Sequence, residues 1–256
     1  MSRIHPYLTN GTKSDQSIWE VIEGGTDLSG GLYPVGTRAA LEDGRVFYYA
    51  RNRSTALVAG VLLTAELQTA EFVDLATADG VVAGDTTITP TTGATAITVN
   101  EYAGGYVIVQ DATGEGKTYT IKSHPLIAGT SAVVLTLDDP VNVDFHNDVT
   151  ITMIKNLWAD VIIAPAAAAH IPVGVSNVAV PAGTTNPQWF WCQTWGMCSV
   201  WQDETPTIGQ LVGSGPDTAG QVGVWNGPVT PEPIVGVSTW TAVAAEYNAT
   251  VLMIAP

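Results

Sequence analysis

Residues 189–201 read Trp-Phe-Trp-Cys-Gln-Thr-Trp-Gly-Met-Cys-Ser-Val-Trp, a run in which bulky apolar side chains dominate. In an extended strand, Trp189, Trp191 and Trp195 fall on one face, while Phe190 falls on the other. A strand that is apolar on both faces is expected in a protein core or at a seam between subunits, where Trp is enriched. The tryptophans predicted to lie in the core or in an oligomer interface are Trp189, Trp191, Trp195 and Trp201.

The same run contains both cysteines of the chain, Cys192 and Cys198. They are too few for a disulfide scaffold or for the four protein ligands of a structural zinc site. A turn at Trp195-Gly196 would bring the two thiols together across a hairpin and allow a disulfide. Nothing in the sequence marks an oxidising compartment, so we favour two buried free thiols.

The chain is poor in charge and strongly acidic. Only 13% of its 256 residues are charged, 46% are hydrophobic, and the net charge is −15. No Lys or Arg follows Lys155, although six acidic residues do. Because phosphates and anionic lipids are bound mainly by Lys and Arg, this composition argues against nucleic acid and against a membrane surface as partners. Residues 1–20 lack the apolar core of a signal peptide, and no apolar stretch is long enough to span a bilayer.

Outside the tryptophan-rich run, the sequence is dominated by strand patterns. Residues 117–123 alternate Tyr119 and Ile121 with Thr and Lys, which is the two-residue period of a half-buried strand. Val-Gly-Val occurs three times, a pattern typical of strands whose backbone bends or is closely approached by another segment. Residues 55–69 fit either a short helix or a strand. The other predicted strands are 45–51, 86–89, 96–100, 106–111, 133–137, 149–154 and 247–254.

These patterns predict a mainly β protein with two small antiparallel β-barrel or sandwich domains preceded by an extended N-terminal arm. The short strands and the many Gly and Pro residues are the basis of this fold class. The predicted segments are an arm at 1–45, a connecting strand or short helix segment at 46–79, an antiparallel domain at 80–155 and a Trp-rich domain at 156–256.

Two segments resemble binding motifs without meeting their requirements. Gly114 to Thr118 reads Gly-Glu-Gly-Lys-Thr, but a phosphate-binding loop needs a Gly where Asp111 stands, and it must open a helix. We therefore predict a hairpin turn there. Asp138, Asp139, Asp144 and Asp148 surround one strand connection; this spacing is not that of an EF-hand, and whether the loop binds a cation stays open.

Basic residues are concentrated around one aromatic strand near the N-terminus. Arg and Tyr are both favoured at protein interfaces, so this segment is a candidate contact for an acidic partner. The alternative is ordinary surface ion pairing with Glu42 and Asp43. The candidate interface residues are Arg38, Arg45, Tyr48, Tyr49, Arg51 and Arg53.

A series of runs rich in glycine and strand-forming residues extends over most of residues 40–256. These runs begin at Asp43 (DGRVFYYA), Ala56 (ALVAG), Tyr102 (YAGGYVIV), Gly114 (GEGKTYTIKSH), Pro172 (PVGV), Pro181 (PAG), Trp191 (WCQTWG) and Val235 (VGV), with a closing strand after Glu246-Tyr247. Together they resemble the capsid decoration proteins of tailed bacteriophages, which are also called cement or head-stabilisation proteins. The resemblance is carried by this pattern of glycines and strands, and no catalytic signature contributes. This chain departs from the pattern in its density of Trp and Cys.

The resemblance implies a structural virion protein, without catalytic residues or cofactors, on the outer surface of an icosahedral head. Family members commonly form homotrimers and clamp neighbouring subunits of the major capsid protein. Under this hypothesis, the arm and the Arg–Tyr segment touch the shell, and the Trp-rich domain forms the oligomer core. The alternative is a carbohydrate- or host-receptor-binding module of a phage fibre or tail, because aromatic ring faces stack on sugars.

Overall fold

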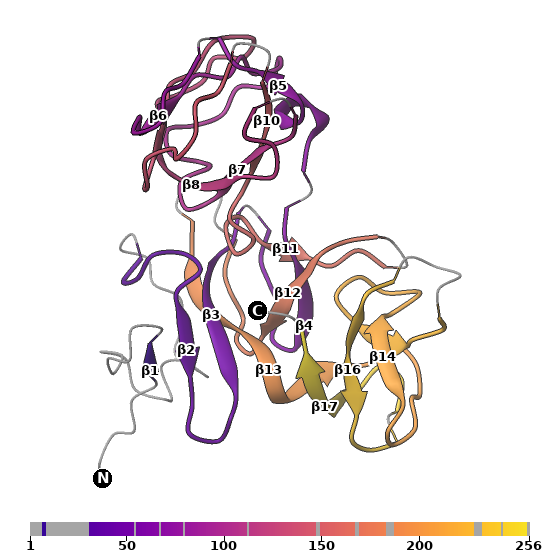
Figure 1. Cartoon of the computed structure of the whole chain (residues 1–256). Coiled ribbons are helices and arrows are strands. Elements are labelled where there is room, and N and C mark those ends of the chain that lie inside the picture. Colours follow the sequence, from indigo (N-terminus) through magenta and orange to yellow (C-terminus); the bar gives the residue numbers. More distant parts are fainter. Residues whose placement is uncertain are drawn as a thin grey trace. The chain divides into compact units, whose positions relative to one another are not determined.

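The computed structural model confirms a mainly β fold (Figure 1). It describes residues 31–53, 55–66, 68–78, 80–111, 113–146, 149–166, 169–182, 187–227, 232–241 and 243–254, together with the backbone of Tyr7 and Leu8. Within these ranges the helical content is one three-residue 3-10 turn, η1 (Ala70–Phe72). None of the helices described there is long and apolar enough to cross a membrane. The remainder of the predicted arm, residues 1–6 and 9–30, lies outside the described part.

The chain forms two compact units. Unit 2 is the continuous segment 67–156, and unit 1 combines residues 1–66 with residues 157–256. The predicted connecting segment is therefore divided between them. Its first part, residues 46–66, belongs to unit 1 because its two strands pair with strands from the C-terminal half of the chain.

Unit 2 is built on a six-stranded antiparallel sheet in the order β5-β10-β7-β8-β9-β6. Its core consists of inward-facing aliphatic and aromatic side chains such as Val107, Ile121 and Ile151, all of them fully buried. The strands are β5 (Leu75–Ala76), β6 (Thr87–Ile88), β7 (Tyr106–Val109), β8 (Thr118–Ser123), β9 (Leu135–Leu137) and β10 (Thr150–Ile154).

The hairpin prediction for Gly114 to Thr118 is confirmed. Strands β7 and β8 pair in antiparallel fashion with Val107 opposite Tyr119, and the turn between them opens no helix. The predicted strand 96–100 is wrong, because there only Ile97 makes an isolated bridge, to Ile127. The neighbouring chain bends at Asn100, which has a positive φ of 60°.

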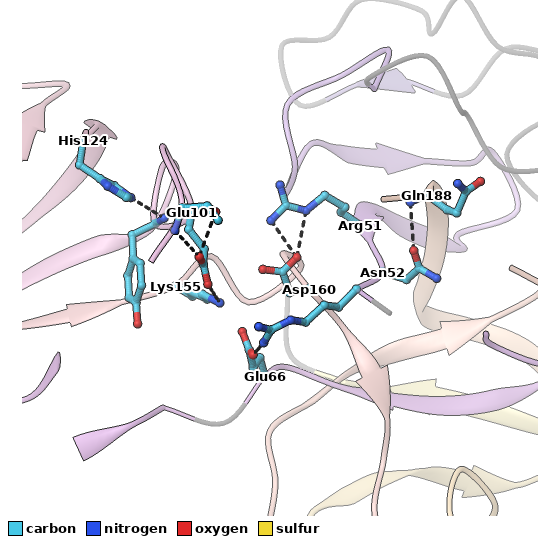
Figure 2. A network of polar contacts seen from close by, with 11 residues as sticks. Arg51, Asn52, Glu66, Glu101, His124, Lys155, Asp160 and Gln188 are labelled. Atoms are coloured by element: carbon cyan, nitrogen blue, oxygen red, sulfur yellow. Dashed lines mark hydrogen bonds and ion pairs between the residues drawn. The ribbon is translucent and has the colours of Figure 1, made fainter. Parts of the chain in front are cut away.

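Unit 2 also buries a small polar network (Figure 2). Lys155 Nζ lies 2.7 Å from Glu101 Oε1, and both side chains are largely buried. His124 Nε2 accepts a hydrogen bond from the Tyr102 backbone N–H at 2.9 Å, and its Nδ1 lies 2.7 Å from the Pro125 carbonyl oxygen. These contacts satisfy the buried polar groups of the loop that precedes β7, as a packed interior requires.

Unit 1 is built on an eleven-stranded sheet whose main path is β1-β2-β3-β13-β17-β16-β14-β15, with β4, β11 and β12 attached beside it. All pairs of named strands are antiparallel. The strands are β1 (Tyr7–Leu8), β2 (Arg38–Ala40), β3 (Val46–Arg51), β4 (Val61–Thr64), β11 (Ile162–Ile163), β12 (Pro172–Ser176), β13 (Trp189–Trp201), β14 (Leu211–Ser214), β15 (Val222–Val224), β16 (Ile234–Ser238) and β17 (Tyr247–Met253).

Of the two alternatives predicted for residues 55–69, the structure has the strand, β4, and all four of its residues are buried. Each Val-Gly-Val repeat also forms a strand, namely β12, β15 and β16. A Cβ atom on Gly174 would lie 2.5 Å from Cys192 Sγ, so a neighbouring strand approaches that backbone closely, as the pattern predicted.

We expect unit 1 to fold without unit 2. Ala65 and Leu157, which flank the insertion, pack in one apolar cluster, so a Gly-Ser linker of about six residues can replace residues 67–156. All eight tryptophans lie outside 67–156, so Trp fluorescence during thermal unfolding reports on unit 1 alone. The shortened chain should unfold cooperatively within about 5 °C of the intact protein. A non-cooperative transition would contradict this, and the isolated segment 67–156 is the reciprocal control, followed by far-UV circular dichroism.

Candidate functional site

The 13-residue strand β13 changes neighbours along its length. Its first half pairs with β3 and β12, and its second half pairs with β17. The pairing register with β3 shifts between Gln193 and Trp195, and Gly196 has a φ of +86°. Such a bulge bends a strand and interrupts its alternation of faces. The chain does not turn back at Trp195-Gly196, so a hairpin that faces the two cysteines toward each other is not formed.

The bulge separates the four predicted tryptophans into different surroundings. Trp191 is buried, and Trp189 packs beside it in a cluster that also contains Phe47 and Tyr49. Trp201 is half-buried and stacks on Tyr247 with ring centroids 5.7 Å apart. Trp195 is 45% exposed. The expectation that Trp189, Trp191 and Trp195 share one environment is therefore wrong, because the bulge falls between the second and the third.

Beyond the bulge, four strands present a continuous apolar surface. Trp195 lies opposite Met253, Met197 opposite Val251, Val251 opposite Val237, and Val237 opposite Leu211. Residues opposite each other in antiparallel strands share a face of the sheet. Met197 is 52% exposed, and the four side chains on β14, β16 and β17 are half-buried. We call this the Trp195 face, and it consists of Trp195, Met197, Leu211, Val237, Val251 and Met253.

The Trp195 face contains no charged side chain, and arginines stand at its border. A hollow of about 320 Å³ beside Trp195 is lined by Arg38, Gly44, Val46 and Thr194. The guanidinium of Arg38 also lies against Tyr48; burial raises the pKa of the Tyr48 hydroxyl, and Arg38 offsets part of that rise. Trp195 thus stands between a cationic side chain and an apolar sheet, a combination enriched in binding hot spots.

Two of the predicted interface residues instead belong to the core. Tyr48 and Tyr49 are buried, with exposed fractions of 8% and 1%. The Tyr48 ring stacks on Trp158 with centroids 4.1 Å apart and planes within 4° of parallel. Tyr49 packs edge-on against Trp191 at 5.0 Å. Within unit 1 their rings therefore stabilise the fold.

Arg51 forms a largely buried ion pair with Asp160 (Figure 2). Its Nε and one terminal nitrogen donate to the same oxygen of Asp160 at 3.1 and 2.8 Å. The two side chains are 23% and 9% exposed. The backbone strengthens this connection, since Arg51 N–H donates to the Trp158 carbonyl and Val161 N–H donates to the Arg51 carbonyl, each at 2.9 Å. Arg51 thus ties the segment that enters β11 to β3.

Arg45 and Arg53 make ion pairs nearer the surface. Arg53 pairs with Glu66, and its own side chain is 54% exposed. Arg45 pairs with Asp43 at 2.7 Å, which matches the alternative of local surface pairing considered for this segment. Of the predicted cationic set, Arg38 lines the hollow beside Trp195, and Arg45 packs against Gly196, the residue that follows Trp195.

The two cysteines of unit 1 and the hydroxyl of Ser214 are buried. Both cysteines are free and buried, as predicted, and burial raises the pKa of each thiol, that of Cys198 to about 12. His170 Nε2 lies 2.9 Å from Ser214 Oγ, which resembles half of a catalytic triad. Ser214 is only 1% exposed, so this hydroxyl is closed to a substrate.

Sequence patterns did not single out the apolar partners of Trp195. Met253 and Val251 lie in a predicted strand, 247–254, whose alternation could have placed them on one face with Tyr247. The local sequence does not show which residue lies opposite another on the neighbouring strand, because the pairing of β17 with β13 joins residues about 50 positions apart.

Comparison with known proteins adds no further assignment: no family model, no curated protein and no solved structure matches the chain.

The Arg51–Asp160 pair predicts a stability effect at Arg51 that its exposed neighbour Arg53 lacks. Arg51→Glu places a second carboxylate against the buried Asp160 and should lower the free energy of unfolding by about 3 kcal/mol. Arg53→Glu opposes Glu66 at an exposed position and should cost less than about 1 kcal/mol. Urea unfolding followed by Trp fluorescence measures both. Equal losses in the two variants would show that the buried pair has no special role.

Proposed function

We propose that this chain is a structural virion protein that binds the outer surface of an icosahedral phage head and cements neighbouring major capsid protein subunits. The observation that carries the proposal is the Trp195 face, an exposed, uncharged apolar surface bordered by arginines in a chain of net charge −15. The sequence resemblance to capsid decoration proteins supports the same function. In this proposal the chain is not an enzyme and uses no cofactor.

The composition of the surface suits protein binding. Trp and Arg are the residues most enriched in hot spots, and Met is enriched at interfaces. Burying apolar area contributes roughly 25 cal/mol per Å², so removing Trp195 and Met197 from water favours association. Nucleic acid and lipid surfaces are poor partners for it, because the two bordering arginines are too few to offset the acidic remainder.

The size of the face suits a contact that is repeated many times. The Trp195 face consists of six residues, which is fewer than the roughly 20–30 residues per side of a standard stable interface. One such contact is weak in isolation. Arrayed over an icosahedral lattice, or held in a homotrimer, the same contact gains affinity through effective concentration without any new interaction.

The proposed shell contact differs from the one that the sequence suggested. Tyr48, Tyr49 and Arg51 are buried or largely buried within unit 1. Arg38, Arg45 and Arg53 remain, and of these Arg38 and Arg45 lie near Trp195 and form the cationic part of the proposed contact. Trp195, first considered for the oligomer core, joins them. The homotrimer rests on the family resemblance alone.

A carbohydrate- or host-receptor-binding role on a fibre or tail is the second candidate. The observation in its favour is that aromatic side chains remain exposed in unit 1, with Trp240 at 69% and Trp195 at 45%. The two roles differ in copy number. A decoration protein should approach the major capsid protein in abundance, whereas a fibre or tail protein is present in a handful of copies per particle.

The test is quantitative mass spectrometry of gradient-purified particles from the source, together with rebinding of purified protein to stripped particles. We expect a copy number within a few-fold of the capsid protein. Trp195→Ala should weaken rebinding at least 30-fold, since truncating a hot-spot Trp costs about 2 kcal/mol or more.

Trp240→Ala is the matched control, because it removes an exposed Trp that is not part of the Trp195 face, and it should rebind normally. Absence of the chain from particles would overturn the proposal. A few copies per particle would favour the fibre or tail role. Equal rebinding of the two variants would move the contact away from the Trp195 face.

A further inference from the structure

A second hollow in unit 1, of about 280 Å³, lies where the bend of β13 faces the loop before β4. Its lining includes Arg45, Asn177, Met197, Ser199 and Tyr247, together with the buried Cys198. We call it the Arg45 hollow. A pocket of this size is at the lower limit of small-molecule sites and fits a single six-membered ring with its substituents.

Among the described residues that line the hollow, Arg45 is the one with a charged side chain. Its Nε and one terminal nitrogen bind Asp43 at 2.7 Å each. A guanidinium has five N–H donors, so about three of them are left for another acceptor. The carboxylate of Asp43 is about half exposed and lies two residues from Arg45, so it is a weak partner that a ligand carboxylate can displace.

Uncharged groups on the walls add fixed hydrogen-bonding positions. Asn177 Nδ2 donates one hydrogen to Gln193 Oε1 at 2.9 Å, and Asn177 Oδ1 lies 3.4 Å from Cys198 Sγ. These contacts fix the orientation of the amide, and its second hydrogen remains available. Ser199 is exposed on the neighbouring strand and offers a hydroxyl. Such groups match the hydroxyls of a sugar better than they match a purely apolar ligand.

One wall is aromatic and held in place. The Tyr247 hydroxyl donates to the Ala59 carbonyl at 2.9 Å, and its ring stacks on Trp201. Tyr247 is nevertheless 52% exposed. This fixed, accessible ring is a flat apolar surface in the lining of the hollow, and the C–H groups of a pyranose can pack on it while the sugar keeps its hydroxyl hydrogen bonds.

We propose that the Arg45 hollow binds an acidic monosaccharide unit such as a uronic acid. The sugar carboxylate pairs with Arg45, its ring packs on Tyr247, and its hydroxyls bind Asn177 and Ser199. Arginine suits this role because its planar fork matches a carboxylate. Asp43 competes with the sugar carboxylate for the positive charge of Arg45, because it binds Nε and one terminal nitrogen of the same guanidinium. This site goes beyond the proposed capsid function and does not depend on it.

The test is titration of the purified full chain with D-glucuronate, followed by Trp fluorescence and by calorimetry. D-Glucose and acetate are the matched ligands, since one lacks the carboxylate and the other lacks the ring. We expect saturable binding of glucuronate, with at least 10-fold weaker binding of both controls.

Two substitutions give opposite expectations. Arg45→Gln should weaken glucuronate binding at least 10-fold and remove its preference over glucose, while Asp43→Asn should strengthen binding several-fold because the competing carboxylate is gone. A merely structural role of the ion pair would shift both variants in the same direction. If Arg45→Gln does not fold, the Asp43→Asn variant alone tests the site: stronger glucuronate binding supports it, and unchanged or weaker binding contradicts it.

Trp195→Ala separates this inference from the capsid proposal. Trp195 does not line the Arg45 hollow, so this variant should bind glucuronate normally while losing particle rebinding. No saturable glucuronate binding, or equal binding of glucuronate and glucose, would overturn the sugar-acid site whatever the particle result. Unchanged binding in both Asp43→Asn and Arg45→Gln would do the same.

Discussion

The buried amide of Gln193 holds the bend on which unit 1 depends. Its Nε2 donates to the carbonyls of Trp195 and Met197 at 3.1 and 2.8 Å, and its Oε1 accepts from Asn177. Backbone acceptors that the bulge removes from the ladder are thereby satisfied inside the protein, where an unpaired carbonyl would be costly. Gly196 completes the bend with a φ of +86°, and Arg45 packs where its side chain would stand. One strand can therefore join β3 and β12 to β17.

The bend also creates the candidate sites, because it breaks the alternation of β13. Before the bulge, Trp191 faces the core; after it, Trp195 faces solvent. Both hollows lie at this point of the strand, one beside Trp195 and one beside Met197. A straight 13-residue strand would have kept its tryptophans on one face. The exposed surface is thus a geometric consequence of the same interaction that links the two halves of the sheet.

Local patterns in the sequence were sufficient for most of the strands. The two-residue period of 117–123 and the Val-Gly-Val repeats predicted β8, β12, β15 and β16, since burial on one face and close backbone approach leave local signals. The helix alternative at 55–69 arose because a short apolar run is compatible with either a buried helix or a buried strand.

Pairing between strands that are distant in the sequence leaves no such local signal. Neither the Arg51–Asp160 pair, 109 residues apart, nor the apolar row across β14, β16 and β17 follows from composition or spacing.

Charge repulsion and apolar attraction oppose each other in this chain, and under the proposed function this opposition matters for binding on an array. Copies of net charge −15 repel one another beyond contact distance, and at physiological salt this repulsion is screened over about 8 Å. The Trp195 face is uncharged, so its attraction is short-ranged and little affected by salt. Two copies in free solution gain only one small apolar contact, and the repulsion between their net charges opposes it. In the proposed decoration role, many copies on an ordered surface repeat that contact, and the high effective concentration strengthens each one without a new interaction.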